Sequence, residues 1–416
     1  MAAETETGSD APADPGPVSP AVARTVSPAA AGAAAEAASR APEPDEVWRL
    51  PSGTAWIYYG HGRRGLARPV VLADGFSTGP TELDLAWELL DRGAYPFLTR
   101  LRESGRGLVL TGFDERSASV PANAENVRAA VLRAIARRRG RGALTVGGFS
   151  MGGVVSRYAL TKLEHEGVDH RTGLYVSYDS PHHGAWLPIC LQAFAHYLRP
   201  LSGGFSAQIN SPAARQLLWR HLAQVGGTPA EDPARTAFLA ELRSMGWWPR
   251  RCRRIGVANG AGRGTGNGVP AGAEALSVGG LVFNGTRLYT QAAGEDPVVG
   301  KLRSLVGRRR TVRAGGLPEL DGAPGGLLES FGTLADELDR LGRTRVHHRS
   351  VCFVPTVSAL AVRGARLDRQ EDLYADLSGL PAEASELDEF RCASTNEAHT
   401  LMTEELGSWI LDRLPD

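Results

Sequence analysis

The sequence has few cysteines and no long apolar run. None of its four cysteines, Cys190, Cys252, Cys352 and Cys392, forms a Cys-x-x-Cys pair. That spacing excludes a clustered zinc site and a dense disulfide framework, and it favours buried or unused thiols in a reducing compartment. A Cys352–Cys392 disulfide would require export. No stretch approaches the roughly 18 consecutive apolar residues of a membrane-spanning helix.

The sequence also lacks an excess of either charge and a recognisable signal peptide. It has 46 Lys and Arg residues against 46 Asp and Glu, and all but two of the basic residues are Arg. Nucleic-acid-binding proteins normally show a basic excess, so we expect no nucleic-acid partner. The N-terminus carries Glu4, Glu6 and Asp10 and lacks basic and apolar signal regions, so we expect a cytoplasmic protein. Nothing in the sequence indicates an oligomeric state.

Aromatic residues are absent before Trp48. Residues 1–45 contain 15 Ala and 7 Pro. Such a segment buries too little apolar area to offset its ordering entropy, so we predict a disordered tail at 1–45 and a folded domain at 46–416.

In the remaining sequence, short apolar runs alternate with helical patterns. This alternation predicts an α/β fold with a mostly parallel sheet covered by helices on both faces. The predicted strands are Ala55–Tyr59, Pro69–Ala73, Gly107–Gly112, Ala143–Gly148, Gly173–Tyr178, Arg254–Ala258, Leu281–Tyr289 and Val351–Val357. The predicted helices are Glu125–Arg138, Gly153–Glu164, Ser211–Val225, Thr236–Met245, Leu327–Leu341 and Thr400–Leu414.

Two stretches are longer than a single crossover requires. Residues 187–248 predict a helical cap inserted over a pocket, with apolar residues such as Phe194, Tyr197 and Trp219. Residues 299–349 look like a second insertion, whose function the sequence does not reveal.

Residues 143–153 carry the motif with the clearest chemical meaning. Gly148-x-Ser150-x-Gly152 directly follows a predicted strand and directly precedes a predicted helix. A nucleophilic serine stands on such a strained turn, where flanking glycines allow close backbone approach. We therefore predict Ser150 as the nucleophile; an ordinary glycine-rich turn is the alternative.

Four segments together resemble α/β-hydrolases of the serine esterase and lipase superfamily. They are Val70–Phe76, Gly148–Gly153, Asp179–Gly184 and Asn396–His399. The resemblance spans roughly Trp48 to Leu414. It is strongest to the bacterial lipase-like branch that also contains GPI inositol-deacylase-like proteins, and it implies an α/β-hydrolase fold with an inserted helical cap.

The resemblance also implies an oxyanion hole. By position, the backbone N–H groups of Phe76 and Met151 would stabilise the developing oxyanion. Asp74 stands where relatives usually carry His, which leaves a backbone donor role intact. A plain strand-to-loop turn at Phe76 is the alternative.

The superfamily's chain order of Ser, acid and His indicates His399 as the general base, because it precedes the last predicted helix. A surface or capping histidine is the alternative. His182 and His183 resemble a lipase turn in which a histidine supports the pocket wall.

The acid is the least defined member of the site. The resemblance would place it after Arg254–Ala258, but Asn259 and Gly260 follow that run. Asp179, at the end of another predicted strand, is our preferred candidate to orient the His399 ring. Asp296, Asp368 and Asp372 remain alternatives.

We therefore predict a serine hydrolase that cleaves carboxylic esters, with an apolar, small or lipid-like substrate and an acyl-enzyme intermediate. This chemistry needs no cofactor and no metal. Gly60, Gly62 and Gly65 match a dinucleotide fingerprint, but no helix follows, so we interpret them as a hairpin turn. The alternatives are an acyltransferase or thioesterase acting on a carrier-bound chain, a catalytically inert binding protein on a hydrolase scaffold, and a docking protein that acts through its tail.

Overall fold

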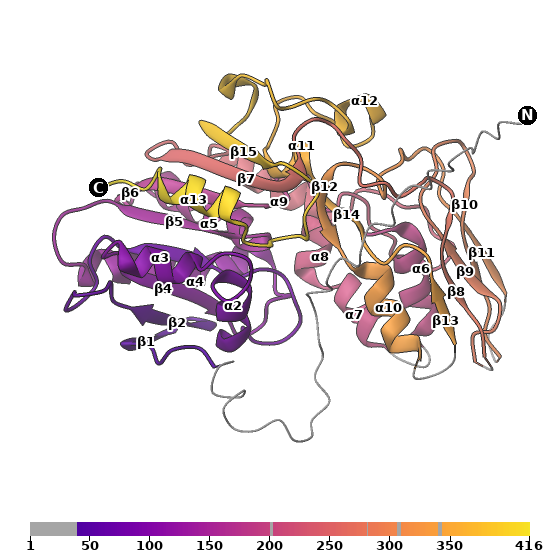
Figure 1. The fold of residues 1–416 in the computed structure, drawn as a ribbon, viewed down its shortest axis with the longest axis horizontal. Helices are drawn as coiled ribbons and strands as arrows, with labels where there is room; N and C mark the ends of the chain where they lie inside the picture. The colour runs from indigo at the N-terminus through magenta and orange to yellow at the C-terminus, as the bar shows by residue number, and fades with distance from the viewer. Residues whose placement is uncertain (1–39, 200–202, 281, 306–308, 340–342) are drawn as a thin grey trace, which may run out of the picture. The chain divides into compact units, whose positions relative to one another are not determined.

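The computed structural model describes residues 40–199, 203–280, 282–305, 309–339 and 343–416 (Figure 1). All of these except Arg40 belong to a compact unit that spans Ala41–Asp416. The predicted tail at 1–45 therefore lies mostly outside the described residues. Its last five residues belong to the compact unit, where the Ala41 N–H donates to Asp84 Oδ1 at 2.7 Å and the Tyr58 hydroxyl donates to Pro42 O at 2.8 Å.

Eight strands form a large sheet in the order β1-β2-β4-β3-β5-β6-β7-β15. The pairs β1–β2 and β2–β4 are antiparallel, and every other pair of neighbours is parallel. This confirms the predicted α/β class with a mostly parallel sheet. The strands are β1 Glu46–Leu50, β2 Gly53–Tyr58, β3 Val70–Ala73, β4 Leu108–Phe113, β5 Leu144–Phe149, β6 Thr172–Tyr178, β7 Arg253–Ala261 and β15 Glu389–Ala393.

The predicted hairpin at Gly60–Gly65 is wrong. The strands on either side of it, β2 and β3, are separated in the sheet by β4, so the segment is a crossover connection. Extended runs on both sides of a turn do not reveal whether those runs pair with each other.

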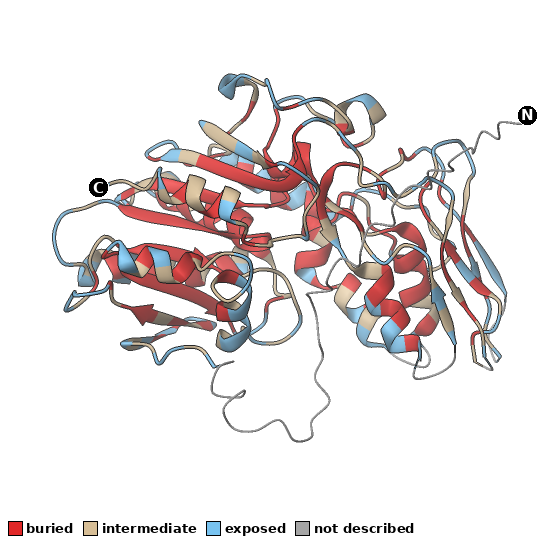
Figure 2. Ribbon diagram, viewed as in Figure 1, coloured by how far each residue is buried: buried red, intermediate tan, exposed pale blue. Residues whose placement is uncertain are grey.

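Helices cover both faces of the large sheet, because each buries an apolar stripe against it (Figure 2). One face carries α2 Leu83–Leu90, α3 Phe97–Glu103 and α13 Glu404–Leu411. The other carries α4 Val120–Arg137, α5 Met151–His165 and α9 Pro233–Ser244. Every residue of β3, β4 and β5 is buried, as expected for strands covered on both faces.

Three predicted helices are shorter in the structure, and tertiary pairing or capping explains each difference. The helix predicted at Ser211–Val225 ends at Leu217, because the Ala185 N–H donates to Leu217 O and the Trp219 N–H donates to Ala185 O. The closing helix begins at Glu404, where the Thr403 hydroxyl accepts the Leu406 N–H at 3.3 Å.

The helix predicted at Leu327–Leu341 is α10 Ser330–Asp339. Leu327 and Leu328 belong instead to strand β12 (Gly325–Leu328), which pairs with β14 (Val351–Pro355). Leu341 lies outside the described residues.

Helix α6 (Ile189–Leu198) of the predicted cap and helix α10 of the predicted second insertion share a hydrophobic core. Helix α9, which also lies within 187–248, packs on the large sheet instead. Phe194 of α6 packs edge to face against Phe283, with 5.7 Å between ring centroids. An antiparallel sheet, β11-β10-β9-β8-β13, lies beside these helices in Figure 1. Further elements here are α6 Ile189–Leu198, α7 Gly204–Ile209, α8 Pro212–Leu217, β8 Glu274–Val278, β9 Thr286–Tyr289, β10 Val298–Leu302, β11 Arg310–Arg313, β12 Gly325–Leu328, β13 Thr344–Val346, β14 Val351–Pro355, α11 Thr356–Ala359, α12 Gln370–Leu373 and the 3₁₀ helix Ala382–Ala384.

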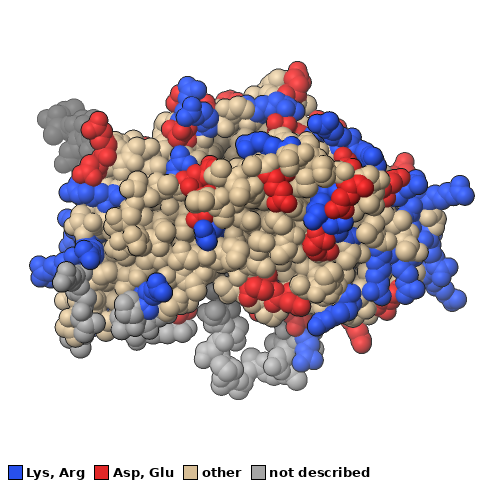
Figure 3. Space-filling view, turned by 180° about the vertical axis from the view of Figure 1, so that it is seen from behind, with Lys and Arg blue, Asp and Glu red and all other residues tan. Residues whose placement is uncertain are grey.

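Charged side chains of both signs lie next to one another on the face shown in Figure 3. Ion pairs in the structure include Arg128–Glu125 and Arg254–Asp388. Within the described ranges, all four cysteines are free thiols. The same part of the chain holds no helix with the length and hydropathy of a membrane span.

Candidate active site

Ser150 lies on a tight turn between β5 and α5. Its backbone has φ 53° and ψ −123°, a sparsely populated conformation for a residue with a side chain. A Cβ at Gly148 would lie 2.4 Å from the Gly152 carbonyl carbon, and one at Gly152 would lie 2.1 Å from Ala73 O. The turn therefore needs glycine at both positions, as the motif predicts.

His399 is in hydrogen-bonding contact with both Ser150 and Asp179. Its Nε2 lies 2.7 Å from Ser150 Oγ, and its Nδ1 lies 2.7 Å from Asp179 Oδ2. With Nδ1 protonated, the ring donates to the carboxylate and accepts the serine hydroxyl. Phe353 packs edge-on against the imidazole at 4.9 Å and limits its rotation.

Asp179 is fully buried at the end of β6. Strand β6 pairs in parallel with β5, which leads to Ser150. Because the carboxyl ends of parallel strands lie at the same edge of a sheet, Asp179 and Ser150 lie at that edge together. The Asn259 N–H donates to Asp179 Oδ1 at 3.0 Å, so one oxygen is held by β7 and the other faces His399. The position where the resemblance would place the acid thus supplies a backbone donor to the carboxylate.

Strand β12 holds the loop that carries His399. The Leu327 N–H donates to Glu397 O at 2.9 Å, and the His399 N–H donates to Leu327 O at 2.7 Å. The Asn396 Oδ1 accepts N–H groups from Ala261 and Gly325 at 2.9 and 3.0 Å. Together these bonds join the loop to β7 and β12.

Gly326 lies against the Asp179 carboxylate. A Cβ at this position would lie 2.0 Å from Asp179 Oδ2, the oxygen that faces His399. Sequence reasoning missed Gly326, Leu327 and Phe353, and it gave Asn396 no role of its own within the segment Asn396–His399. The adjacent glycines at 325 and 326 are a signal of close backbone approach, but nothing in the sequence indicates what approaches them.

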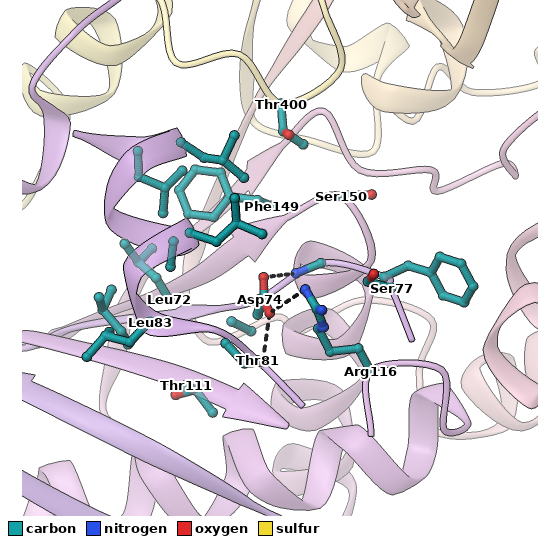
Figure 4. A pocket seen from close by; sticks show the side chains of 18 of the residues that line it. Leu72, Asp74, Ser77, Thr81, Leu83, Thr111, Arg116, Phe149, Ser150 and Thr400 are labelled. Carbon is teal, nitrogen blue, oxygen red and sulfur yellow. Dashed lines mark hydrogen bonds and ion pairs between the residues drawn. The ribbon is translucent and has the colours of Figure 1, made fainter. Parts of the chain in front are cut away.

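The loop after β3 carries Phe76, the first predicted oxyanion donor. Within the described residues, neither the Phe76 N–H nor the Met151 N–H donates to another protein group. The Asp74 carboxylate orders this loop by accepting the Gly75 N–H and the Thr81 hydroxyl, both at 2.7 Å (Figure 4). Burial raises the pKa of Asp74.

Arg116 holds the far side of the same loop. Its guanidinium donates to Thr78 O at 3.2 Å and to Gly79 O at 3.4 Å, and it lies 3.8 Å from Asp74 Oδ2 (Figure 4). Asp74 and Arg116 therefore hold the loop in place, and among the described residues the N–H groups of Phe76 and Met151 have no protein acceptor.

Two cavities open onto Ser150 and His399. The first, of about 250 Å³, lies beside α2 and is the one drawn in Figure 4. The second, of about 360 Å³, is lined by residues of α6, α7, α8 and α10. Phe76 lines both.

His182 and His183 lie away from Ser150. His182 Nε2 is 2.8 Å from Ser177 Oγ, and the ring packs against Trp248 at 4.8 Å. Burial lowers the pKa of His182, and it lowers that of His183 to about 4, so both rings are neutral at pH 7. Neither ring is among the residues that line the two cavities at Ser150, so their support of the pocket wall stays a prediction.

The other candidate acids lie elsewhere. Asp296 pairs with Arg313 at 2.7 Å, and Asp368 pairs with Arg366 at the same distance. Asp372 accepts the Arg366 N–H. Of the four candidates, the structure brings Asp179 to His399.

The strand order of the large sheet, with Ser150 after β5 and His399 after β15, defines an α/β-hydrolase fold. No family model matches the sequence, and no curated protein matches it either.

Solved structures with a similar arrangement include esterases and lipases. One is the lipase BlEst2 of Bacillus licheniformis in propeptide form, at 12% identity and a TM-score of 0.34, covering 50% of this chain and 40% of that one. Another is an esterase of Pyrobaculum calidifontis, at 15% identity and a TM-score of 0.32, covering 51% of this chain and 65% of that one. A bacterial heroin esterase has 14% identity, a TM-score of 0.32 and the same two coverages. The match thus spans less than two thirds of each of these proteins.

Proposed function

We propose that this protein is a serine hydrolase that cleaves carboxylic esters, with Ser150, His399 and Asp179 as a catalytic triad. The observation that carries the proposal is the pair of 2.7 Å contacts linking Ser150 Oγ to His399 and His399 to Asp179. The strained turn under Ser150 is that of a nucleophile elbow. The motifs at Val70–Phe76 and Asn396–His399 support a place in the bacterial lipase-like branch related to GPI inositol-deacylase-like proteins.

In the proposed reaction, His399 Nε2 takes the proton of the Ser150 hydroxyl as Oγ attacks the ester carbonyl carbon. The N–H groups of Phe76 and Met151 hold the oxyanion. Loss of one such donor typically raises the activation free energy by about 3–4 kcal/mol. Collapse of the intermediate breaks the bond to the alcohol oxygen, which takes the proton from His399. Water, deprotonated by the same ring, then attacks the carbonyl carbon of the acyl-enzyme. Collapse of this second intermediate breaks the bond to Ser150 Oγ, which takes the proton back from His399 as the acid is released.

The buried Asp179 carboxylate stabilises the imidazolium that forms in both steps and keeps Nδ1 protonated. This role distinguishes an active hydrolase from an inert hydrolase-fold binding protein, which has no need of an oriented base.

A fluorophosphonate probe tests the proposal, because it labels serines that a neighbouring base activates. We expect the wild type to be labelled at Ser150 and Ser150→Ala to be unlabelled, with circular dichroism showing that both are folded. Ser378→Ala, which removes an exposed serine, should be labelled like the wild type. Folded wild-type protein without labelling would overturn the proposal and favour the inert scaffold.

The acceptor is tested separately. We expect water to be the acceptor, so ester hydrolysis should proceed without an added alcohol or thiol. Product that appears only in the presence of such an acceptor would instead identify an acyltransferase.

A further inference from the structure

The two cavities at the site share three lining residues, Phe76, Ser150 and His399. Their remaining walls come from different parts of the chain. One cavity lies between the β3 loop and α2, and the other lies among the helices of the cap and α10. They therefore leave Ser150 in different directions.

The larger cavity is almost entirely apolar. Its wall includes Leu191 and Phe194 of α6, Leu217 of α8, Leu334 of α10 and Phe353. At about 360 Å³ it falls in the size range of small-molecule sites. Apart from Ser150 and His399, its polar lining residues are Gln208, Ser330 and Thr333, and none of these three is charged. A wall of this composition binds hydrocarbon chiefly by removing it from water.

The smaller cavity has an apolar wall as well. Leu83, Leu85 and Leu89 of α2 face Leu72 and Phe149 of the large sheet. Its two charged residues, Asp74 and Arg116, are already bound to the loop that they order. The free surface that a ligand meets is therefore chiefly hydrocarbon.

A carbonyl carbon attacked by Ser150 Oγ must sit where the two cavities meet. Its acyl chain and its alkoxy group diverge from that point, as the two cavities do. Accordingly, we propose that the substrate is an ester with a hydrocarbon chain on each side of the carboxyl group, an alkyl ester of a fatty acid, and that each cavity holds one chain. This inference rests on the proposed function.

A matrix of substrates tests the inference: methyl, butyl and octyl esters of acetic, butyric and octanoic acid. Each buried methylene contributes about 0.8 kcal/mol, so kcat/KM should rise roughly fourfold per methylene until a cavity is filled. We expect the rise along both axes of the matrix. A rise along one axis alone would overturn the two-chain inference while leaving ester hydrolysis intact.

Two variants fill one cavity each. Ala86→Phe fills the smaller cavity from α2, and Gln208→Phe fills the larger one from α7. Each should lower kcat/KM about tenfold for esters with a long chain on one side of the carboxyl group. One variant should discriminate against long acyl chains and the other against long alkoxy chains.

The matched controls are Glu88→Phe and Ala207→Phe, exposed positions on the same two helices that line neither cavity. For every ester of the matrix, kcat/KM of these two variants should stay within twofold of the wild-type value. If Ala86→Phe and Gln208→Phe impair the same side of the ester, a single cavity binds substrate and the inference is wrong. Loss of all hydrolysis together with loss of fluorophosphonate labelling would instead overturn the proposed function beneath it.

Discussion

At the scale of single residues, backbone strain is concentrated at the candidate site. Ser150 has φ 53° and Asp179 has φ 46°, both in the left-handed region that non-glycine residues seldom adopt. Each stands directly after a parallel strand, β5 or β6, where the strand ends and the chain turns. The strain directs Ser150 Oγ and the Asp179 carboxylate toward His399, and the surrounding sheet stabilises it.

Asp179→Asn tests the identity of the acid, for which the sequence offered four candidates. An amide at this position cannot hold Nδ1 of His399 protonated or stabilise the imidazolium, so kcat should fall about 10⁴-fold with little change in the unfolding midpoint. Asp296→Asn, an exposed candidate acid paired with Arg313, should retain wild-type kcat. Steady-state kinetics on one ester measures both. Full activity in Asp179→Asn would exclude Asp179 as the orienting acid.

At the scale of secondary-structure elements, β12 connects the inserted region to the candidate triad. The Leu327 N–H donates to Glu397 O, and Leu327 O accepts the His399 N–H. The loop that carries His399 is therefore bonded to β12, which on its other side pairs with β14. Gly326, one residue earlier, allows this strand to approach the Asp179 carboxylate. Part of the region whose function the sequence did not reveal is thus a support for the site.

Gly326→Ala should impair catalysis without unfolding the protein. The added methyl group displaces the Asp179 carboxylate from His399, and a displacement of about 1 Å costs on the order of a hundredfold in rate. The control is Gly300→Ala in β10, where a Cβ would meet Val312 at an ordinary 3.5 Å. We would compare kcat and melting temperature for the two variants. Equal kcat in both would show that β12 does not position the acid.

Asp321, within 299–349, links the loop before α6 to the loop after β9. Its carboxylate accepts the Trp186 Nε1–H and the Gln291 N–H, both at 2.6 Å. Burial raises its pKa from 3.8 to about 6. Because the folded-state pKa lies above the unfolded value, the stabilisation is fully present below pH 4 and is lost as the pH rises through 6.

We therefore expect Asp321→Asn to remove a pH dependence of stability. The free energy of unfolding of the wild type, relative to the variant, should fall by about 2 kcal/mol between pH 4 and pH 7. Urea unfolding at both pH values measures it, and taking the difference between the proteins cancels the other titrating groups. Parallel pH profiles would show that Asp321 is not the source.

At the scale of the whole molecule, the boundary between the tail and the folded unit can be tested by truncation. Deletion of residues 1–45 removes the hydrogen bonds of Ala41, Pro42 and Asp45 to the folded unit, whereas deletion of 1–39 keeps them. We expect the longer deletion to be less stable than the shorter one by about 1–3 kcal/mol in chemical denaturation. Both should hydrolyse esters, and loss of activity on removal of 1–39 would favour a function in the tail.

What the sequence determined by itself is local. The α/β class follows from apolar runs of strand length alternating with amphipathic helices, and Ser150 follows from glycines that a tight strand-to-helix turn requires. His399 follows from the resemblance, whose chain order of Ser, acid and His puts the base before the last helix. The first two signals lie within short segments, where spacing and residue type are sufficient.

Tertiary structure decided the remainder. Asp179 was one of four candidate acids until the pairing of β5 with β6 brought it to the sheet edge that carries Ser150. Gly326 and Leu327, far along the chain, reach the same point through β12, and the helix predicted beyond Leu217 is replaced by pairing with Ala185. Contacts between residues this distant in sequence depend on which strands pair and in what register. A local pattern of residues specifies neither the pairing partners nor the register.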